Sequence, residues 1–277
     1  MKCIFTAGLE VAILNLKLVG DKLTTGDLDS LLQTIPTSDI LCVLSTTSCF
    51  APRIPDDVEY ISRTCKEHSI PHVINNAYGL QCTKICSQVR EAVRIGRVDF
   101  IVQSTDKNFL VPVGGALVAS PNKVLLDKLN TIYPGRASMS NILDLFVTFL
   151  QMGSQKMVKL VKDRKEKSIA FKEKLSQVVE KYGERVLDTK GNSISFAATC
   201  KDEELGSKLF VRRVSGCRFI GQKEKEVCGI RFRNYGSSFD GYPYNYFTAA
   251  CALGLSDVEI ERFIERLSQL LKPTDKT

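Results

Sequence analysis

Apolar residues in the first half of the chain alternate between two spacings. In residues 24–35 they recur at three- and four-residue intervals, which is typical of one face of a helix, and Pro36 ends the pattern. A continuous apolar run of strand length follows at residues 40–44. The same succession then returns, with helices predicted at 56–67 and 80–95 and strands predicted at 72–75 and 98–103. Strands that alternate with helices indicate an α/β fold with a mainly parallel sheet.

The pattern changes after the strand predicted at 98–103. Residues 110–118 follow it too closely for a parallel crossover, so these two strands are predicted to be antiparallel. The chain is then predicted to be helical from 141 to about 182. Beyond this helix we expect strands at 193–199, 209–214 and 227–232 and helices at 243–254 and 256–271. We therefore predict a large α/β domain at 1–160 and a small C-terminal α/β domain at 161–277.

The composition is that of a globular protein and narrows the choice of partners only slightly. Of the 277 residues, 44% are hydrophobic and 25% are charged, and no apolar run approaches the roughly 18 residues of a membrane span, so we expect no membrane partner. The ten cysteines form no C-x-x-C pair and several lie in apolar runs, which predicts free thiols and a cytoplasmic location. The net charge of +7 is compatible with a polyanionic partner but does not require one.

Two polar residues mark a candidate site at one edge of the predicted sheet. Asn75 closes one strand and Lys107 lies just past the next, and ligands of open α/β sheets bind beyond the carboxyl ends of the strands. A lysine followed by Gly114 and Gly115 meets the needs of pyridoxal phosphate, which binds an amine covalently and lies close to the backbone. Ser104 is a candidate contact to the cofactor phosphate. Spacing alone leaves a solvated lysine, a turn-capping asparagine and a turn-forming serine as the alternatives.

The two histidines of the chain do not favour a metal site. His68 and His72 are four residues apart, but Pro71 breaks the helix that would align them. We therefore expect no metal.

Five segments of the chain resemble successive blocks of the O-phosphoseryl-tRNA(Sec) selenium transferase family, also called selenocysteinyl-tRNA synthases. They are, in order, STTSCFAPR at 45–53, NNAYG at 75–79, QSTDKNF at 103–109, VPVGGA at 111–116 and YPGRAS at 133–138. The resemblance extends from about Cys3 to about Leu271. It is strongest from 41 to 140 and weakens between 160 and 205.

The resemblance implies a fold, a cofactor and a set of site residues. The implied architecture is that of fold type I pyridoxal phosphate enzymes, with a large mainly parallel-sheet domain, a small C-terminal domain and active sites built across a dimer. Lys107 resembles the lysine that holds pyridoxal phosphate, and Asn75 resembles the residue that faces its ring nitrogen. Arg136 resembles an arginine that meets the phosphate of the substrate, a role that suits a guanidinium fork.

The resemblance also implies contacts to tRNA. Arg94 and Arg212 resemble tRNA-contacting arginines, and Lys276 is a candidate for a third contact in a tail that no longer matches the family. The alternative for the two arginines is an ordinary surface charge. The lysine-rich stretch at 156–174 is more typical of a solvated helix face than of an RNA contact.

The implied activity converts O-phosphoseryl-tRNA(Sec) into selenocysteinyl-tRNA(Sec), with selenophosphate as the selenium donor and with a tetramer as the family's assembly. One alternative is another fold type I lyase or decarboxylase, which would share Lys107 but not the YPGRAS block. A second alternative is an inactive, truncated fragment that keeps only tRNA or partner binding. Family members are longer at the N-terminus, so we expect the loop around the cofactor phosphate and much of the substrate clamp to precede this chain, which alone should not turn over.

Overall fold

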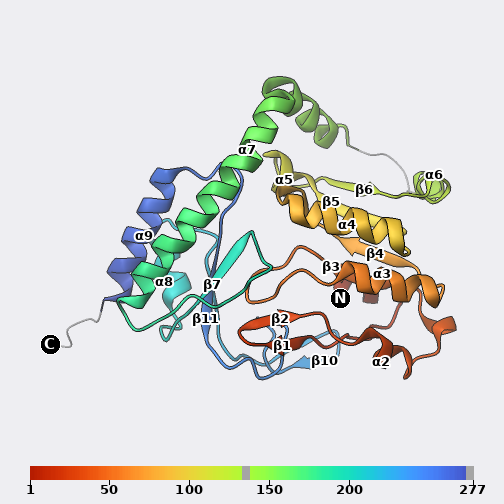
Figure 1. Cartoon of the computed structure of the whole chain (residues 1–277), viewed down its shortest axis with the longest axis horizontal. Coiled ribbons are helices and arrows are strands. Elements are labelled where there is room, and N and C mark those ends of the chain that lie inside the picture. The colour runs from red at the N-terminus through yellow and green to blue at the C-terminus, as the bar shows by residue number, and fades with distance from the viewer. Residues whose placement is uncertain (133–137, 273–277) are drawn as a thin grey trace.

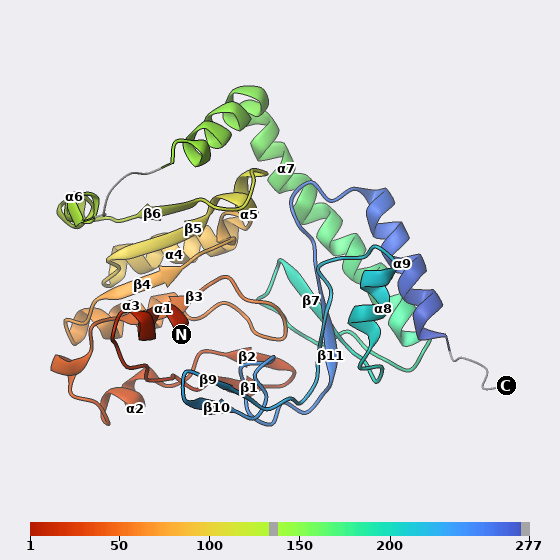
Figure 2. The same cartoon turned by 180° about the vertical axis from the view of Figure 1, so that it is seen from behind.

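The structure is a computed structural model that describes residues 1–132 and 138–272. The larger sheet has four strands. Figure 1 shows helices in front of this sheet, a long helix that crosses the molecule, and a second sheet flanked by helices near the C-terminus. Figure 2 shows the same arrangement from behind. The α/β architecture predicted from the alternating pattern is confirmed.

The larger sheet has the strand order β3-β4-β5-β6. Its first three strands are parallel, and β6 pairs antiparallel with β5, as the short connection predicts. The strands are β3 (Val43–Thr46), β4 (His72–Asn75), β5 (Phe100–Ser104) and β6 (Ala116–Ala119). The prediction for β4 matches the strand, whereas β3 begins three residues later than predicted.

Two amphipathic helices cover one face of this sheet. The helix α3 (Val58–Glu67) begins at Asp57, whose carboxylate accepts the Tyr60 backbone N–H at 3.0 Å. The helix α4 (Thr83–Ile95) follows a 3-10 turn. Buried aliphatic side chains of β4, α3 and α4 form a common core; these are Ile74, Val58, Ile85, Val89 and Ala92. The burial of these side chains stabilises the sheet, whose edge carries the candidate site.

Short elements surround this sheet before the chain crosses to the C-terminal part. They are α1 (Lys2–Thr6), β1 (Lys17–Val19), β2 (Lys22–Thr24), α2 (Leu28–Leu32), 3-10 turns at Thr37–Asp39 and Gly79–Gln81, α5 (Thr105–Phe109) and α6 (Lys123–Ile132). The long helix α7 (Ser140–Glu180) then crosses the molecule and contains a break at Gly153, where φ is 63°. The predicted domain boundary at 160 falls inside α7 and stays a prediction.

The C-terminal part packs a small antiparallel sheet against helices. Its strand order is β7-β11-β8, and a separate hairpin pairs β9 with β10. Phe171, Leu175, Phe196, Phe247 and Phe263 are buried together in its core. The elements are β7 (Ser195–Thr199), α8 (Leu205–Val211), β8 (Arg218–Ile220), β9 (Lys225–Val227), β10 (Ile230–Phe232), β11 (Tyr246–Ala250) and α9 (Asp257–Leu271).

Three predictions for this part were wrong. The single strand predicted at 227–232 spans the turn between β9 and β10. Residues 209–214, predicted as a strand, contain the end of the helix α8, because Leu205 and Leu209 both point into the core at helical spacing. Residues 243–254, predicted as a helix, contain β11, the central strand of the small sheet. A strand with neighbours on both sides and buried faces lacks the alternation that identifies a strand in a sequence.

The buried ring of His72 predicts a loss of stability below neutral pH. Its Nδ1 donates to the Arg97 carbonyl at 3.1 Å, which leaves Nε2 to accept the Ser45 hydroxyl at 2.8 Å. Burial lowers the pKa of His72 below its ordinary value of 6.5, against a smaller opposing effect of the Arg97 carbonyl and of Asp99 and Asp56. The unfolded chain therefore binds a proton that the folded chain resists, and stability falls as the pH drops below this value.

We expect a slope of up to about 1.4 kcal/mol per pH unit from this group, measured by urea unfolding between about pH 7.5 and about pH 5.5. His72→Gln should remove this contribution. His68→Gln, at an exposed position, is the matched control and should keep it. Equal pH dependence in the His72 variant and the parent would contradict the assignment.

Candidate functional site

The carboxyl ends of the parallel strands form a polar edge. Thr46, at the end of β3, donates its hydroxyl to the Asn75 carbonyl at 3.3 Å. Thr47 donates its hydroxyl to the Asn76 side chain at 2.6 Å. The turns after β3 and β4 are thus tied to each other, and the edge is held in one shape.

The Lys107 side chain stands on a single helical turn that directly follows β5. Its Nζ donates to the Ser104 hydroxyl oxygen at 3.2 Å and to the Asp106 carboxylate at 3.4 Å. The side chain is 47% exposed, so its amine can be reached from solvent. The Ser104 hydroxyl donates to Asp106 and, as the largest effect, lowers the pKa of that carboxyl. Ser104 and Lys107, both predicted as site residues, are therefore brought together.

Two side-chain amides, neither of them predicted from the sequence as a site residue, fix this turn. The buried Asn108 donates its amide N–H groups to the Ala77 carbonyl at 2.8 Å and the Ser104 carbonyl at 2.6 Å. The Gln81 side chain donates to the Lys107 carbonyl at 2.5 Å. The first contact joins the lysine turn to the segment after β4. Asn108 lies inside the QSTDKNF block, which is the only sequence signal that pointed toward it.

Asn75 closes β4 on the same edge and has a defined orientation. Its Oδ1 accepts the Ala77 backbone N–H at 3.2 Å, so its NH2 group is the one left to meet a ligand. Asn108 binds the carbonyl of the same Ala77, which links the Asn75 turn to the Lys107 turn. The Lys107 amine and the Asn75 amide donor therefore lie on the same edge of the sheet. An accessible amine fits the aldehyde of pyridoxal phosphate, and an amide donor fits its ring nitrogen.

Gly115 has a structural role beside this turn. A Cβ atom at Gly115 would lie 2.5 Å from the Thr105 hydroxyl oxygen, so glycine lets the chain entering β6 pass close to α5. Gly114 and Gly115 were predicted from the sequence to let the backbone lie close to a cofactor. The structure gives Gly115 a reason that needs no ligand.

The remaining predicted residues lie apart from this edge or outside the described residues. Arg94, in the last turn of α4, is exposed and donates to the Glu91 carboxylate through Nε at 2.8 Å and Nη2 at 2.5 Å. Arg212 follows α8 and donates Nη1 to the Lys208 carbonyl at 3.3 Å. Arg136 and Lys276 lie outside the described residues.

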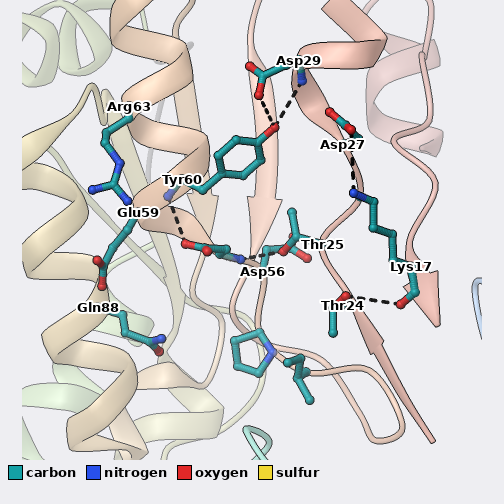
Figure 3. Close-up of a pocket in the computed structure, with 14 residues that line it drawn as sticks. Lys17, Thr24, Thr25, Asp27, Asp29, Asp56, Glu59, Tyr60, Arg63 and Gln88 are labelled. Carbon is teal, nitrogen blue, oxygen red and sulfur yellow. Dashed lines mark hydrogen bonds and ion pairs between the residues drawn. The ribbon is translucent and has the colours of Figure 1, made fainter. Parts of the chain in front are cut away.

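A separate polar cavity of about 650 Å³ lies beside α2 and α3 (Figure 3). Asp27 caps α2 by accepting the Ser30 N–H at 3.1 Å, and Tyr60 donates its hydroxyl to Asp29 at 2.7 Å. Burial, followed by this hydrogen bond, raises the pKa of Tyr60. The Asp56 carboxylate accepts from Arg53 at 2.8 Å. These acidic groups hold helices and loops in place, and none of the predicted site residues that the structure describes lines the cavity.

Metal-binding clusters and membrane-spanning helices are both absent from residues 1–132 and 138–272. No cluster of three or more histidine, cysteine, aspartate or glutamate side chains there is arranged to hold a metal ion. None of the helices in the same described ranges combines the length and apolar character needed to cross a bilayer.

Comparison with known proteins supplies relatives for almost the whole chain. The sequence model of the family described as O-phosphoseryl-tRNA(Sec) selenium transferase, SepSecS, matches residues 1–272. A curated protein of that name from Dictyostelium discoideum is 44% identical over 98% of this chain and 62% of its own length. Its counterpart from Caenorhabditis elegans is 37% identical over 97% and 58%. The chain therefore spans about 60% of the length of these curated relatives.

Solved structures of related proteins match the fold of this chain. The crystal structure of an archaeal O-phosphoseryl-tRNA(Sec) selenium transferase matches with a TM-score of 0.88 and 30% identity, over 97% of this chain and 61% of that one. A sphingosine-1-phosphate lyase from Burkholderia pseudomallei K96243 matches with a TM-score of 0.67 and 15% identity, over 97% and 59%, which shows a shared fold alone. The chain thus has the fold type I architecture of pyridoxal phosphate enzymes. Since the family's sequence model covers 1–272, the chain belongs to the O-phosphoseryl-tRNA(Sec) selenium transferase family.

Proposed function

We propose that the chain supplies the cofactor lysine and tRNA-binding segments of an enzyme that converts O-phosphoseryl-tRNA(Sec) into selenocysteinyl-tRNA(Sec), with selenophosphate as selenium donor. The observation that carries the proposal is the accessible Lys107 amine at the carboxyl edge of the parallel strands, where Asn108 fixes its turn. The chain that places this lysine there belongs to the family. All ten cysteines are free thiols. Thiols stay reduced in the cytoplasm, so these cysteines support a cytoplasmic location for the proposed enzyme.

Pyridoxal phosphate, when bound, withdraws electrons from the α-carbon of an amino acid. Lys107 would hold this cofactor through its amine and would act as the base that takes the proton from the α-carbon of the substrate. Ser104 and Asp106 hold the Lys107 amine at the sheet edge. The Asn75 NH2 group would donate to the ring nitrogen, where an aspartate would instead keep that nitrogen charged. Such a contact would favour elimination of phosphate from the β-carbon over transamination.

Arg136 is expected to act on the leaving phosphate and not on the cofactor. Its guanidinium would stabilise the charge that develops as phosphate departs from the β-carbon. We expect Arg136→Ala to lower the rate of phosphate release by about 100-fold or more while the cofactor absorbance stays normal. Rapid-quench measurement of inorganic phosphate gives the rate, and unchanged release would remove Arg136 from the site.

Arg94 and Arg212 are expected to bind tRNA. Each alanine substitution should weaken tRNA binding and reduce the slope of log affinity against log salt by about one unit per lost phosphate contact. Arg63 is an exposed arginine on a different helix, α3, and provides the matched control. Arg63→Ala should leave the salt dependence of tRNA binding unchanged. Fluorescence anisotropy across a salt series measures both quantities. A tRNA affinity that neither Arg94→Ala nor Arg212→Ala alters would make both residues ordinary surface charges.

The proposed enzyme includes a second copy of the chain. Apolar side chains are exposed along β6 and along the first part of α7, which lie on one side of the molecule (Figure 2). They include Leu117 and Val118 of β6 and Ile142, Phe146 and Leu150 of α7, all 38–69% exposed. A monomer rarely leaves such a surface open to water, so this side supports the homo-oligomer that the family resemblance implies.

A further inference from the structure

Two segments that are far apart in the sequence meet beside the candidate site. We name residues 49–53, which follow β3, the β3 loop. We name residues 191–195, which end on the first residue of β7, the β7 entry. The β3 loop extends toward β7 in both views (Figure 1 and Figure 2). Ile194 of the β7 entry is buried in the same core as Val58 and Ile74, so the C-terminal part packs against the larger sheet here.

The side chain of Asn192 uses all of its hydrogen-bonding groups at this contact. Its NH2 group donates to the Cys49 and Arg53 carbonyls, both at 2.9 Å. Its Oδ1 accepts the backbone N–H groups of Ile194 at 3.1 Å and Ser195 at 3.0 Å. The NH2 group therefore ties together the two ends of the β3 loop, while Oδ1 shapes the β7 entry itself.

The middle of the β3 loop is held by a second contact from the same segment. The Ala51 N–H donates to the Ser195 hydroxyl at 2.8 Å, and both residues are buried. Between the held positions, Phe50 stays 48% exposed, with its ring centroid 5.9 Å from that of Tyr78. The β7 entry thus fixes the backbone on both sides of a half-exposed aromatic side chain.

The β3 loop continues directly from residues that contact the Asn75 turn. The Ser48 hydroxyl accepts the Tyr78 backbone N–H at 2.8 Å. The Thr47 N–H donates to the Asn75 carbonyl at 3.0 Å, and the Asn75 turn is joined to the Lys107 turn. Ligands of open α/β sheets bind at this carboxyl edge, so the position of the β3 loop sets part of the shape of the site.

We propose that Asn192 is a positioning residue for the proposed reaction, and that it holds the β3 loop against the edge that carries Asn75 and Lys107. This inference rests on the proposed function, since it takes this edge as the active site. Reacting groups must be held within about 0.5 Å of the productive geometry, and a displacement of about 1 Å can cost about 100-fold in rate. The C-terminal part thereby contributes to a site whose candidate cofactor residues lie on the larger sheet.

Asn192→Asp separates the two roles of this side chain. The substitution keeps an oxygen for the N–H groups of the β7 entry but removes the NH2 group that donates to the Cys49 and Arg53 carbonyls. In the 277-residue chain, hydrogen–deuterium exchange of the β3 loop, followed by mass spectrometry, should become about 10-fold faster. Exchange of β4 should stay at the parental rate, because that strand lies inside the sheet.

Turnover is measured in a chimaera that joins the chain to the part of the Dictyostelium relative outside the match. Rates are expressed per cofactor that borohydride fixes on Lys107, so unfolded molecules do not count. Asn192→Asp should lower kcat for phosphate release by about 10- to 100-fold and leave KM for the tRNA within about 3-fold. Ser195→Ala removes the other contact to the β3 loop and should change loop exchange and kcat in the same directions.

Tyr182→Phe is the control for a general loss of stability. It removes a hydrogen bond of 3.1 Å to Ser268 inside the C-terminal part and should change neither the exchange of the β3 loop nor kcat. If Asn192→Asp fails to fold, Ser195→Ala carries the same comparison with a smaller change in side-chain shape.

The outcomes distinguish this inference from the function on which it rests. If the parent chimaera is active and both variants keep the parental kcat, the inference is wrong and the proposed function stands, even where loop exchange is faster. A lowered kcat with parental exchange of the β3 loop also overturns the inference, because the effect then does not act through this loop. If the parent chimaera releases no phosphate, both fail.

Discussion

Replacing Lys107 with alanine is expected to abolish both the covalent retention of pyridoxal phosphate and turnover. The reason is that the Lys107 amine is accessible on the strand edge, while Asn108 ties its turn to the segment that carries Asn75. We would measure this in a chimaera that joins the chain to the part of the Dictyostelium relative that the match does not cover. Borohydride reduction followed by peptide mapping should find the cofactor on the Lys107 peptide of the parent and on no peptide of the variant.

A lysine elsewhere on the surface provides the control for nonspecific reduction. Lys123 is exposed and pairs with Asp127 at 2.7 Å, so Lys123→Ala should keep the adduct and the rate of the parent chimaera. A cofactor adduct on another peptide of the Lys107→Ala chimaera, together with retained turnover, would place the active amine elsewhere.

Asn108→Asp is expected to destabilise the fold and to displace Lys107. The substitution keeps the shape of the side chain but removes the NH2 group that donates to the Ala77 and Ser104 carbonyls. The Ala77 carbonyl keeps the Ser104 backbone N–H as a donor at 3.0 Å, so the Ser104 carbonyl is the one that loses its side-chain donor. A buried carbonyl without its donor costs about 1–3 kcal/mol, and we expect a loss of that size in the free energy of unfolding. Urea denaturation of the 277-residue chain measures it.

The matched control is Asn141→Asp. Asn141 also donates to a backbone carbonyl, that of Gly114 at 3.3 Å, but on the surface, where water replaces the lost donor. We expect a change within about 0.5 kcal/mol there. Equal stability of the Asn108→Asp variant and the parent would mean that the lysine turn is held by other contacts, such as the one from Gln81.

The periodicity of the first half was enough to predict the α/β sheet. Helical and strand-length runs there differ in length, and the antiparallel direction of β6 against β5 follows from the short connection between them. Asn75 and Lys107 could be placed on the same edge because parallel strands present their carboxyl ends together. The five motif blocks supplied the identity of the cofactor, which spacing alone did not.

Sequence reasoning failed where tertiary packing overrides local pattern. The fully buried Phe247 and Ala249 gave β11 no alternation, and the anchoring of α8 by Leu205 and Leu209 is visible only once α9 packs on it. The hydrogen bond from Asn108 to the Ala77 carbonyl joins residues that are 31 positions apart in the sequence. No local sequence pattern predicts such a contact. The prediction that Ser104 contacts the cofactor phosphate stays a prediction; in the structure its hydroxyl hydrogen-bonds to Asp106.

The conversion of O-phosphoseryl-tRNA(Sec) tests the central claim most directly. The chimaera, supplied with pyridoxal phosphate and selenophosphate, should release inorganic phosphate and form selenocysteinyl-tRNA(Sec), identified by mass spectrometry of the aminoacylated 3′ nucleoside. The Lys107→Ala chimaera should form neither product while still binding the tRNA. Formation of selenocysteinyl-tRNA(Sec) at equal rates by the parent and by the Lys107→Ala chimaera would contradict the assignment of this strand edge as the active site.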